Sequence, residues 1–228
     1  MNARMIIRCR ALIAVIGSVG LWLSGTAPAA TPAEGQQRAE QYLQGLEGLQ
    51  ADFKQTLADR SGQVTDESRG TLAIKRPNRF RWDYREPHEQ VIVSDGTRIW
   101  LYDSDLEQVT VRKLDIALSS TPAMLLSGQG TLTDNFEVTE AVERGGVLWV
   151  RMQPMRNDTD FKSVSLGFAG AKPQELRFME LADKLGQTTL LEFSNVRRNP
   201  KLDDSLFVFK VPDGADVIGD TGGASSNR

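Results

Sequence analysis

The sequence predicts a mainly β protein in which one antiparallel sheet curls into a barrel or half-barrel and a few helices cover its concave face. Three observations predict this class. Apolar residues alternate with polar ones along most of the chain after Leu49, which is typical of strands with one buried face. Turn motifs such as SDGT and RGG separate these segments at the short spacing of antiparallel hairpins. Two further segments have helical patterns, and each needs a surface on which to bury its apolar side.

Residues 1–29 have the pattern of a secretory signal peptide. Three arginines precede an apolar run of 13 residues, which is shorter than the roughly 20 residues of a membrane-spanning helix. Ala27-Pro28-Ala29 fits the small-x-small rule, so we expect cleavage after Ala29 and an exported protein. The signal alone does not say whether the exported protein stays in a periplasm. Cys9 precedes the apolar run, whereas a lipid-modified cysteine would lie at the cleavage point, so we expect no lipid anchor.

Residues 30–228 are expected to fold as a single domain. They contain no cysteine, which excludes disulfides, cysteine metal sites and a cysteine nucleophile. Their length suits one barrel or sandwich with a sizeable core. The whole chain has a net charge of −3, and removal of three arginines with the leader leaves −6, which disfavours nucleic acid and anionic membranes as partners. Residues 219–228 are polar and rich in glycine and serine, so we expect a frayed tail.

The mature chain begins with an amphipathic helix and continues mainly as strands. Ala39, Tyr42, Leu43 and Leu46 recur at helical spacing and form one apolar stripe. The segments SSTPAMLLSG and NPKLDDSLF are two further helical candidates, and Thr121 is the expected N-cap of the first. We expect strands near 49–58, 67–76, 80–86, 89–94, 98–103, 107–113, 135–144, 147–154, 161–169, 174–183 and 187–196.

Catalytic and metal-binding patterns are weak throughout. The chain has one histidine, His88, in a turn-like segment, and it lacks the GxSxG motif of a nucleophile elbow. Closely spaced aspartate pairs occur, but none has the spacing of a calcium loop. We therefore expect no catalytic residue, no metal ligand and no cofactor, so that the protein is not an enzyme.

The stretch KRPNRFRWDY indicates a hairpin whose two strands share an apolar face. On the incoming strand, one face comprises Leu72, Ile74 and Arg76. On the outgoing strand, one face comprises Phe80, Trp82 and Tyr84. A two-residue turn would place Phe80 beside Lys75 and mix charge with aromatic surface. A three-residue loop, Pro77-Asn78-Arg79, instead pairs Arg76 with Phe80 and joins the two apolar faces, so we predict this loop.

Arg76 then stands at the rim of an apolar face, and two interpretations are open. It could extend to solvent or stack on an aromatic ring. Alternatively, its guanidinium could donate to the carbonyls at the end of a covering helix and act as a latch. Burial of the charge without such partners would be costly, so the bonds have to form or water has to enter.

A covering element and a second hairpin complete the concave side. Met124 and Leu125 belong to a segment whose flexible apolar side chains suit a lid that repacks around variable guests, although an ordinary core helix has the same composition. An Asp-Gly turn in VSDGT places Ile92 and Leu101 on one face of the second hairpin. Trp100 lies with Tyr102 on the other face, and the sequence leaves open whether that face is exposed or covered.

These segments carry a family resemblance. The motifs GxLxIKRPNxFxW, VSDGxxIWxY and TPxML, in this order, resemble the periplasmic outer-membrane lipoprotein carrier proteins of the LolA family. The likeness extends from the N-terminal helix to FVFKVPDG. It implies an incomplete antiparallel β-barrel, or half-barrel, covered by an α-helical lid over a hydrophobic cavity.

The resemblance also implies a function and site residues. The cavity would hold the acyl chains of a lipoprotein that an inner-membrane ABC transporter releases and an outer-membrane receptor accepts, and the carrier would be a monomer. Arg76 matches the arginine that bonds the lid in the closed, empty state. Arg79 and Ala123 depart from the family pattern, where a leucine and an aromatic residue are expected. The expected acyl-chain cavity residues are Leu72, Ile74, Phe80, Trp82, Ile92, Leu101, Met124 and Leu125.

Two alternatives remain open at this point. A related carrier of another lipid or glycolipid would present the same apolar cavity, because such a surface does not name its guest. A lipoprotein-sensing protein of the same fold is the second. An anchored receptor would need a lipid-modified cysteine, and a hydrolase would need an acid-base pair.

Overall fold

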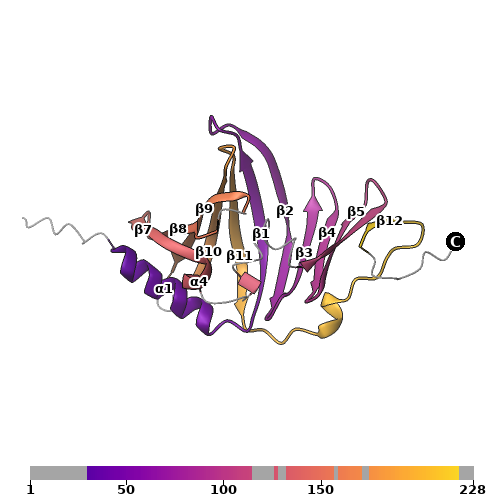
Figure 1. The fold of residues 1–228 in the computed structure, drawn as a ribbon, viewed down its shortest axis with the longest axis horizontal. Coiled ribbons are helices and arrows are strands. Elements are labelled where there is room, and N and C mark those ends of the chain that lie inside the picture. The colour runs from indigo at the N-terminus through magenta and orange to yellow at the C-terminus, as the bar shows by residue number, and fades with distance from the viewer. Residues whose placement is uncertain (1–29, 115–125, 128–131, 157–158, 171–174, 221–228) are drawn as a thin grey trace, which may run out of the picture.

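The computed structural model describes residues 30–114, 126–127, 132–156, 159–170 and 175–220. The predicted signal peptide and nearly all of the predicted tail lie outside these residues, as do Met124 and Leu125. The described chain forms one strongly curved sheet with α1 beside β7 and β8 (Figure 1). The sheet is open, because its strand order runs from β12 to β7 without returning to its start. The predicted half-barrel is therefore confirmed.

The sheet is antiparallel apart from its last strand. Its order is β12-β6-β5-β4-β3-β2-β1-β11-β10-β9-β8-β7, so β1 joins the two halves by pairing with both β2 and β11. The strands are β1 (Gly48–Ala58), β2 (Val64–Lys75), β3 (Arg79–Glu86), β4 (Gln90–Asp95), β5 (Arg98–Asp103), β6 (Gln108–Lys113), β7 (Phe136–Arg144), β8 (Val147–Pro154), β9 (Phe161–Ala169), β10 (Glu175–Asp183), β11 (Thr188–Arg198) and β12 (Asp216–Gly219).

All eleven predicted strands are present, and β12 is an addition that the pattern did not predict. Four residues are too few to display an alternation, and β12 pairs in parallel with β6, which lies far from it in the chain. Its backbone occupies an edge that would otherwise be open to pairing by another chain. The short strand β12 thus protects the β6 edge of the described sheet from pairing with another chain.

The N-terminal helix α1 (Pro32–Gln44) forms as predicted. Thr31 caps it, because its hydroxyl accepts from the Glu34 backbone N–H and its own backbone N–H donates to the Glu34 carboxylate. A proline follows at the first helical position. At Gly35 the helix approaches β7 so closely that an added Cβ would lie 2.5 Å from the Cβ of Ala141. The absence of a side chain there lets the helix lie on the sheet.

Two short helical elements complete the described chain. The predicted helical segment NPKLDDSLF contains a single 3₁₀ turn, η2 (Asp204–Phe207), with Asp203 as its cap. A four-residue helix, α4 (Leu132–Asn135), precedes β7 and had no sequence signal. Of the predicted helix SSTPAMLLSG, the structure describes Leu126 and Ser127, both buried.

The predicted register of the β2–β3 hairpin is wrong by two residues. The ladder pairs Lys75 with Arg79 and Ile74 with Phe80, so the loop is Arg76-Pro77-Asn78 and Arg79 is the first residue of β3. Asn78 has a φ of 64°, a left-handed conformation that asparagine tolerates, and this allows the chain to reverse one residue earlier. A shift of two preserves the faces, so the same side chains still share the concave side although their cross-strand partners differ.

A similar correction applies to the β4–β5 hairpin. The expected Asp-Gly turn is wrong, because Asp95 remains in β4 and the turn is Gly96-Thr97. The Asp95 carboxylate accepts from the Thr97 and Arg98 backbones at 2.7 and 2.9 Å, and Gly96 has a φ of 99°. The faces are again preserved, and Ile92 pairs with Leu101 as part of the same apolar side.

The outer face of this hairpin, left open by the sequence, is covered. The ring of Phe209 lies 6.3 Å from both the Trp100 and the Tyr102 rings. Phe209 belongs to the segment that leads from η2 to β12 (Figure 1). These two aromatic residues therefore do not line the concave side.

Candidate functional site

The candidate site is the concave face of the sheet, which forms one apolar cluster with α1. Leu72, Ile74, Phe80 and Trp82 are each 4% exposed or less and belong to this cluster. Ile92 and Leu101 pack against it while partly exposed. The structure thus brings six of the predicted cavity residues together, and the remaining two lie outside the described residues. Their role in ligand binding stays a prediction.

An aromatic row runs along the middle of this face. The ring of Phe53 lies 5.2 Å from the Trp82 ring and 5.1 Å from the Tyr84 ring. Tyr84 donates its hydroxyl to the side-chain oxygen of Gln55 at 3.1 Å, and burial raises the pKa of Tyr84 to about 12. The predicted set of site residues omitted Phe53, although its alternation with Leu49 along β1 was the signal that could have found it.

Arg76 joins the hairpin loop to both covering elements. Its Nη1 donates to the carbonyl oxygen of Leu43 at 2.6 Å, and its Nε donates to the carbonyl oxygen of Leu126 at 3.2 Å. Burial lowers the pKa of the Arg76 guanidinium, and nearby Tyr42 opposes that shift. An arginine nevertheless stays charged in a protein, so a half-buried cation bonds two carbonyls at the rim of an apolar interior.

Arg76 also complements the end of α1. Leu43 lies in the last turn, where carbonyl groups lack helical partners and the helix dipole is negative. The helix has no basic residue of its own in that turn, so the loop of the β2–β3 hairpin supplies the charge. This geometry matches the second interpretation of Arg76 in its contacts, because the guanidinium donates to carbonyls of both covering elements.

A second anchor holds α1 without Arg76. Arg198 donates to the Tyr42 carbonyl at 2.9 Å and lies over the Tyr42 ring at 5.3 Å. Asn199 donates its amide nitrogen to the Gly45 carbonyl and accepts from the Glu47 backbone, both at 2.8 Å. Sequence analysis did not identify either residue, because both lie more than 150 positions from these partners. Two independent groups therefore fix the end of α1.

The segment at Leu126 and Ser127 is tied to the same loop twice. Besides the Arg76 bond, the Asn78 backbone donates to the Ser127 carbonyl at 3.1 Å. Ser94 in turn donates its hydroxyl to the Asn78 carbonyl at 2.7 Å and so supports the loop. The loop Arg76-Pro77-Asn78 consequently bridges α1 and the Leu126–Ser127 segment.

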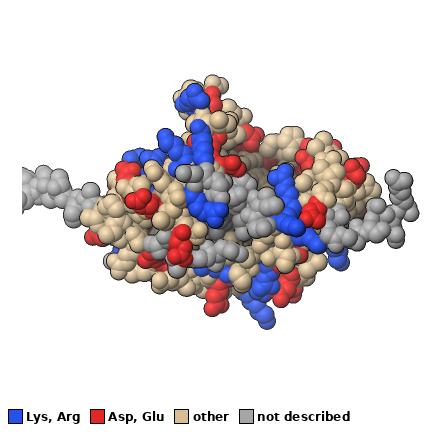
Figure 2. Space-filling view, viewed as in Figure 1, with Lys and Arg blue, Asp and Glu red and all other residues tan. Residues whose placement is uncertain are grey.

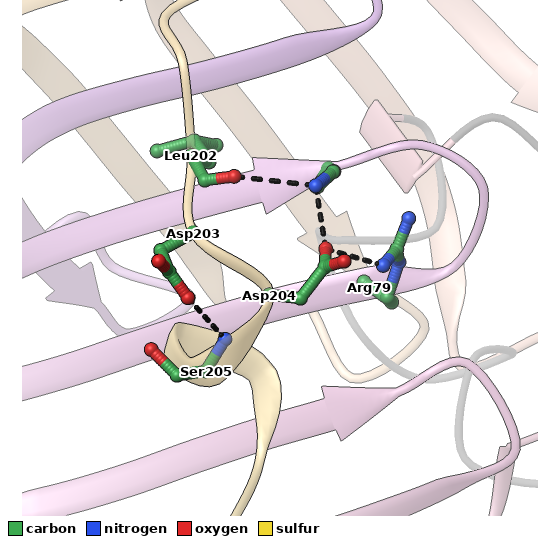
Figure 3. A network of polar contacts seen from close by, with 6 residues as sticks. Arg79, Leu202, Asp203, Asp204 and Ser205 are labelled. Atoms are coloured by element: carbon green, nitrogen blue, oxygen red, sulfur yellow. Dashed lines mark hydrogen bonds and ion pairs between the residues drawn. The ribbon is translucent and has the colours of Figure 1, made fainter.

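The outer side of the same hairpin is held by the segment before η2. Asp204 accepts from Arg79 Nη1 at 2.7 Å and also pairs with Lys75, which donates to the Leu202 carbonyl at 3.2 Å (Figure 3). These contacts, Lys75 foremost, lower the pKa of the Asp204 carboxyl. Phe207 is buried beside them against the outer face. Lys75 and Arg79, which flank the loop, are thus held by the segment on the outer face.

Other polar groups offer weaker candidates. Basic and acidic side chains are interspersed over the face that Figure 2 shows, so charge does not single out a binding surface there. His88 and Asp105 lie 2.7 Å apart at an exposed cleft. Within the described ranges, no group of three metal-ligating side chains could hold an ion. In the same part of the chain, no helix is long and apolar enough to cross a membrane.

Comparisons with known proteins agree with one another. The family model described as "Outer membrane lipoprotein carrier protein LolA" matches residues 44–210. The outer-membrane lipoprotein carrier protein of Dechloromonas aromatica (strain RCB) is 44% identical over 179 residues, which are 78% of this chain and 85% of the relative. That of Azotobacter vinelandii (strain DJ / ATCC BAA-1303) is 44% identical over 203 residues, 87% of this chain and 96% of the relative.

Solved structures resemble the chain more loosely. The crystal structure of a LolA superfamily protein from Nitrosomonas europaea aligns with a TM-score of 0.49 at 13% identity, over 79% of this chain and 99% of that one. The sequence comparisons are therefore the stronger finding.

Proposed function

Because the chain belongs to the LolA family of outer membrane lipoprotein carrier proteins, we propose that it carries lipoproteins by enclosing their acyl chains against the concave face of its sheet. The observation that carries this proposal is the buried apolar face closed at its rim by Arg76. The proposal assigns the protein no enzymatic activity.

The physical need for a carrier follows from the cargo. A lipoprotein with three acyl chains has dozens of methylene groups, and each contributes about 0.8 kcal/mol when it leaves water. Such a molecule does not diffuse freely through an aqueous compartment. The apolar residues of the concave face offer the chains a second buried environment, so transfer between two membranes becomes possible without exposure to water.

Release requires that binding should not be too favourable. Arg76 makes two charge-assisted bonds to the covering elements, and a bond of this kind contributes roughly 1.5–3 kcal/mol. Entry of a ligand between the Leu126 segment and the sheet separates these groups and loses that contribution. The closed state therefore competes with the ligand and weakens its net affinity.

The two anchors indicate which covering element moves. Arg198 and Asn199 hold the end of α1 whether or not Arg76 is bonded. Arg76 and Asn78 each bond the Leu126–Ser127 segment to the hairpin. We propose that α1 stays in place while Leu126 and Ser127 separate from the hairpin, with Arg76 as the latch between them.

The proposed cycle places the protein in the periplasm as a monomer. It would accept lipoproteins from an ABC transporter of the inner membrane and deliver them to a receptor at the outer membrane. Support comes from the family membership and from the N-terminal sequence pattern of a signal peptide cleaved near Ala29.

The latch predicts a defined defect in Arg76→Leu. The variant should fold and accept lipoprotein from spheroplasts, because the apolar face is intact. Release to receptor-bearing outer membranes should slow roughly tenfold, since closure no longer competes with the bound chains. The release rate of a labelled lipoprotein measures the effect, and normal release would contradict the latch.

A matched control and the native cargo complete the test. Arg85→Leu removes an exposed arginine of β3 whose bond to Thr71 is 3.5 Å long, and it should transfer lipoprotein at the normal rate.

Mass spectrometry of the protein isolated from the periplasm should find triacylated lipoprotein. Recovery of another lipid in its place would contradict the proposed cargo and favour a carrier of that lipid.

A further inference from the structure

Trp82 carries a hydrogen-bond donor that the described structure leaves without an acceptor. Its indole Nε1 is buried and bonds no group of the residues described, and the side chain is 4% exposed. Its surroundings are apolar: Phe53 packs on the ring, and Leu72 and Ile92 are its cross-strand neighbours on the concave face. Buried polar groups in proteins are seldom left in this condition.

The other described tryptophans show how unusual this placement is. Trp100 and Trp149 lie on the outer face of the sheet and are partly exposed, and the Nε1 of neither is both buried and unpaired. Tyr84, the neighbour of Trp82 in the aromatic row, has a partner for its hydroxyl in Gln55. Phenylalanine could fill the Trp82 position without a donor. Among the tryptophans that the structure describes, a buried indole N–H without a described acceptor therefore occurs only at Trp82, on the concave face.

If the concave face binds acyl chains, as proposed above, the ligand brings an acceptor that the described residues do not supply to Trp82. Methylene groups accept no hydrogen bond, whereas the carbonyl that joins each fatty acid to glycerol does. An ester carbonyl entering this face would meet an unpaired donor in apolar surroundings, where a hydrogen bond is stronger than in water. Pairing would also remove the cost of the orphan donor.

We infer that the Trp82 indole N–H binds an ester carbonyl of the acylated ligand. Arg76, at the loop end of the hairpin, and Tyr84, further along β3, lie on either side of Trp82. A fixed contact at this point sets how far the chains extend along the face. The inference rests on the proposed acyl-chain binding and adds to it a polar contact that positions the ligand.

Ester and ether ligands distinguish the Trp82 hydrogen bond from acyl-chain binding in general. The probes are a peptide with an S-(dipalmitoylglyceryl)cysteine and the same peptide with two hexadecyl ethers, which lack the carbonyls. Wild type should bind the ester about tenfold more tightly, and Trp82→Phe should abolish that preference by weakening the ester complex alone. Trp149→Phe, the same change on the outer face, should keep the preference.

A spectroscopic measurement on the wild-type protein covers the case in which Trp82→Phe does not fold. The indole N–H signals in a ¹⁵N spectrum report hydrogen bonding directly, and Trp100→Phe and Trp149→Phe identify the Trp82 signal by elimination. That signal should shift downfield with the ester peptide and remain near its free position with the ether.

Each result decides between outcomes. Equal wild-type affinity for ester and ether, with an unshifted Trp82 signal, overturns the donor contact and leaves acyl-chain binding standing. Failure to bind either peptide overturns the proposed function itself. A diacyl phospholipid tests the source of the ester: weaker binding than the peptide supports lipoproteins, and tighter binding assigns the carbonyl to a membrane lipid.

Discussion

At the scale of single residues, the concave face contains polar groups whose chemistry depends on burial. Tyr42 in α1 and Tyr84 in β3 both contribute hydroxyls to this mainly apolar environment. Burial raises the pKa of each to about 12 from the ordinary value of 10.0. Each tyrosine therefore links the stability of the fold to alkaline pH.

The sign of that linkage predicts alkaline unfolding. A raised tyrosine pKa means that folding favours the neutral form, so the contribution is complete below pH 10 and is lost as pH rises from about 10 to 12. A shift of two units corresponds to roughly 2–3 kcal/mol for each residue. Urea titrations between pH 9 and 12 should show this fall, and Tyr84→Phe should make it shallower. Parallel curves for the two proteins would contradict the prediction.

Residue patterns predicted the faces of the strands but not their partners in the ladder. The period of two places Leu72 and Trp82 on one face in any register of the same parity. The local conformations of Asn78 and Gly96, which lie outside the alternation, decided where each turn falls. Arg198 was missed because its contact with α1 depends on the folding of the whole sheet.

At the scale of elements, the close approach of β2 to β3 depends on a glycine. Gly70 sits at an irregularity in the β2–β3 ladder, and a Cβ there would lie 1.9 Å from the backbone oxygen of Asp83. The ring of Phe53 occupies the adjacent space on the concave side. The two strands approach each other at this point more closely than any side chain permits.

Gly70→Ala should therefore destabilise the sheet. The added methyl group meets backbone rather than a movable side chain, so β3 has to shift, at a cost of about 1–3 kcal/mol in the free energy of unfolding. Urea denaturation measures this loss. Thr71→Ala, the next residue on the outer face, should change stability by less than about 0.5 kcal/mol. Similar values for the two variants would refute the close approach.

At the scale of the whole molecule, the two sides of the sheet meet at one hairpin. The loop Arg76-Pro77-Asn78 bonds the covering elements on the concave side. The flanking residues Lys75 and Arg79 bind Asp204 of the outer segment (Figure 3). A change in the outer segment can therefore reach the contacts of Arg76 and Asn78 through the hairpin.

Asp204→Asn tests this connection. Loss of the carboxylate charge should loosen the hairpin, and amide exchange at Asn78, which donates to Ser127, should accelerate. Hydrogen exchange measures the effect, and high salt should reproduce part of it in wild type. The control is Asp203→Asn, because Asp203 caps η2 and asparagine is an equally good cap. Equal exchange in both variants would disprove the connection.

The pairing of β1 with β11 determines when the sheet can be completed during folding. β1 is the first strand of the chain and β11 is the last of the antiparallel ones, so Phe53 meets Phe193 after nearly all of the chain has been made. Loop closure over this distance is slow, and until it occurs β1 presents an open edge of eleven residues. A chain that stops before β11 would retain that edge, which is a template for aggregation. The same strand that unites the finished sheet is thus the most vulnerable part of the nascent one.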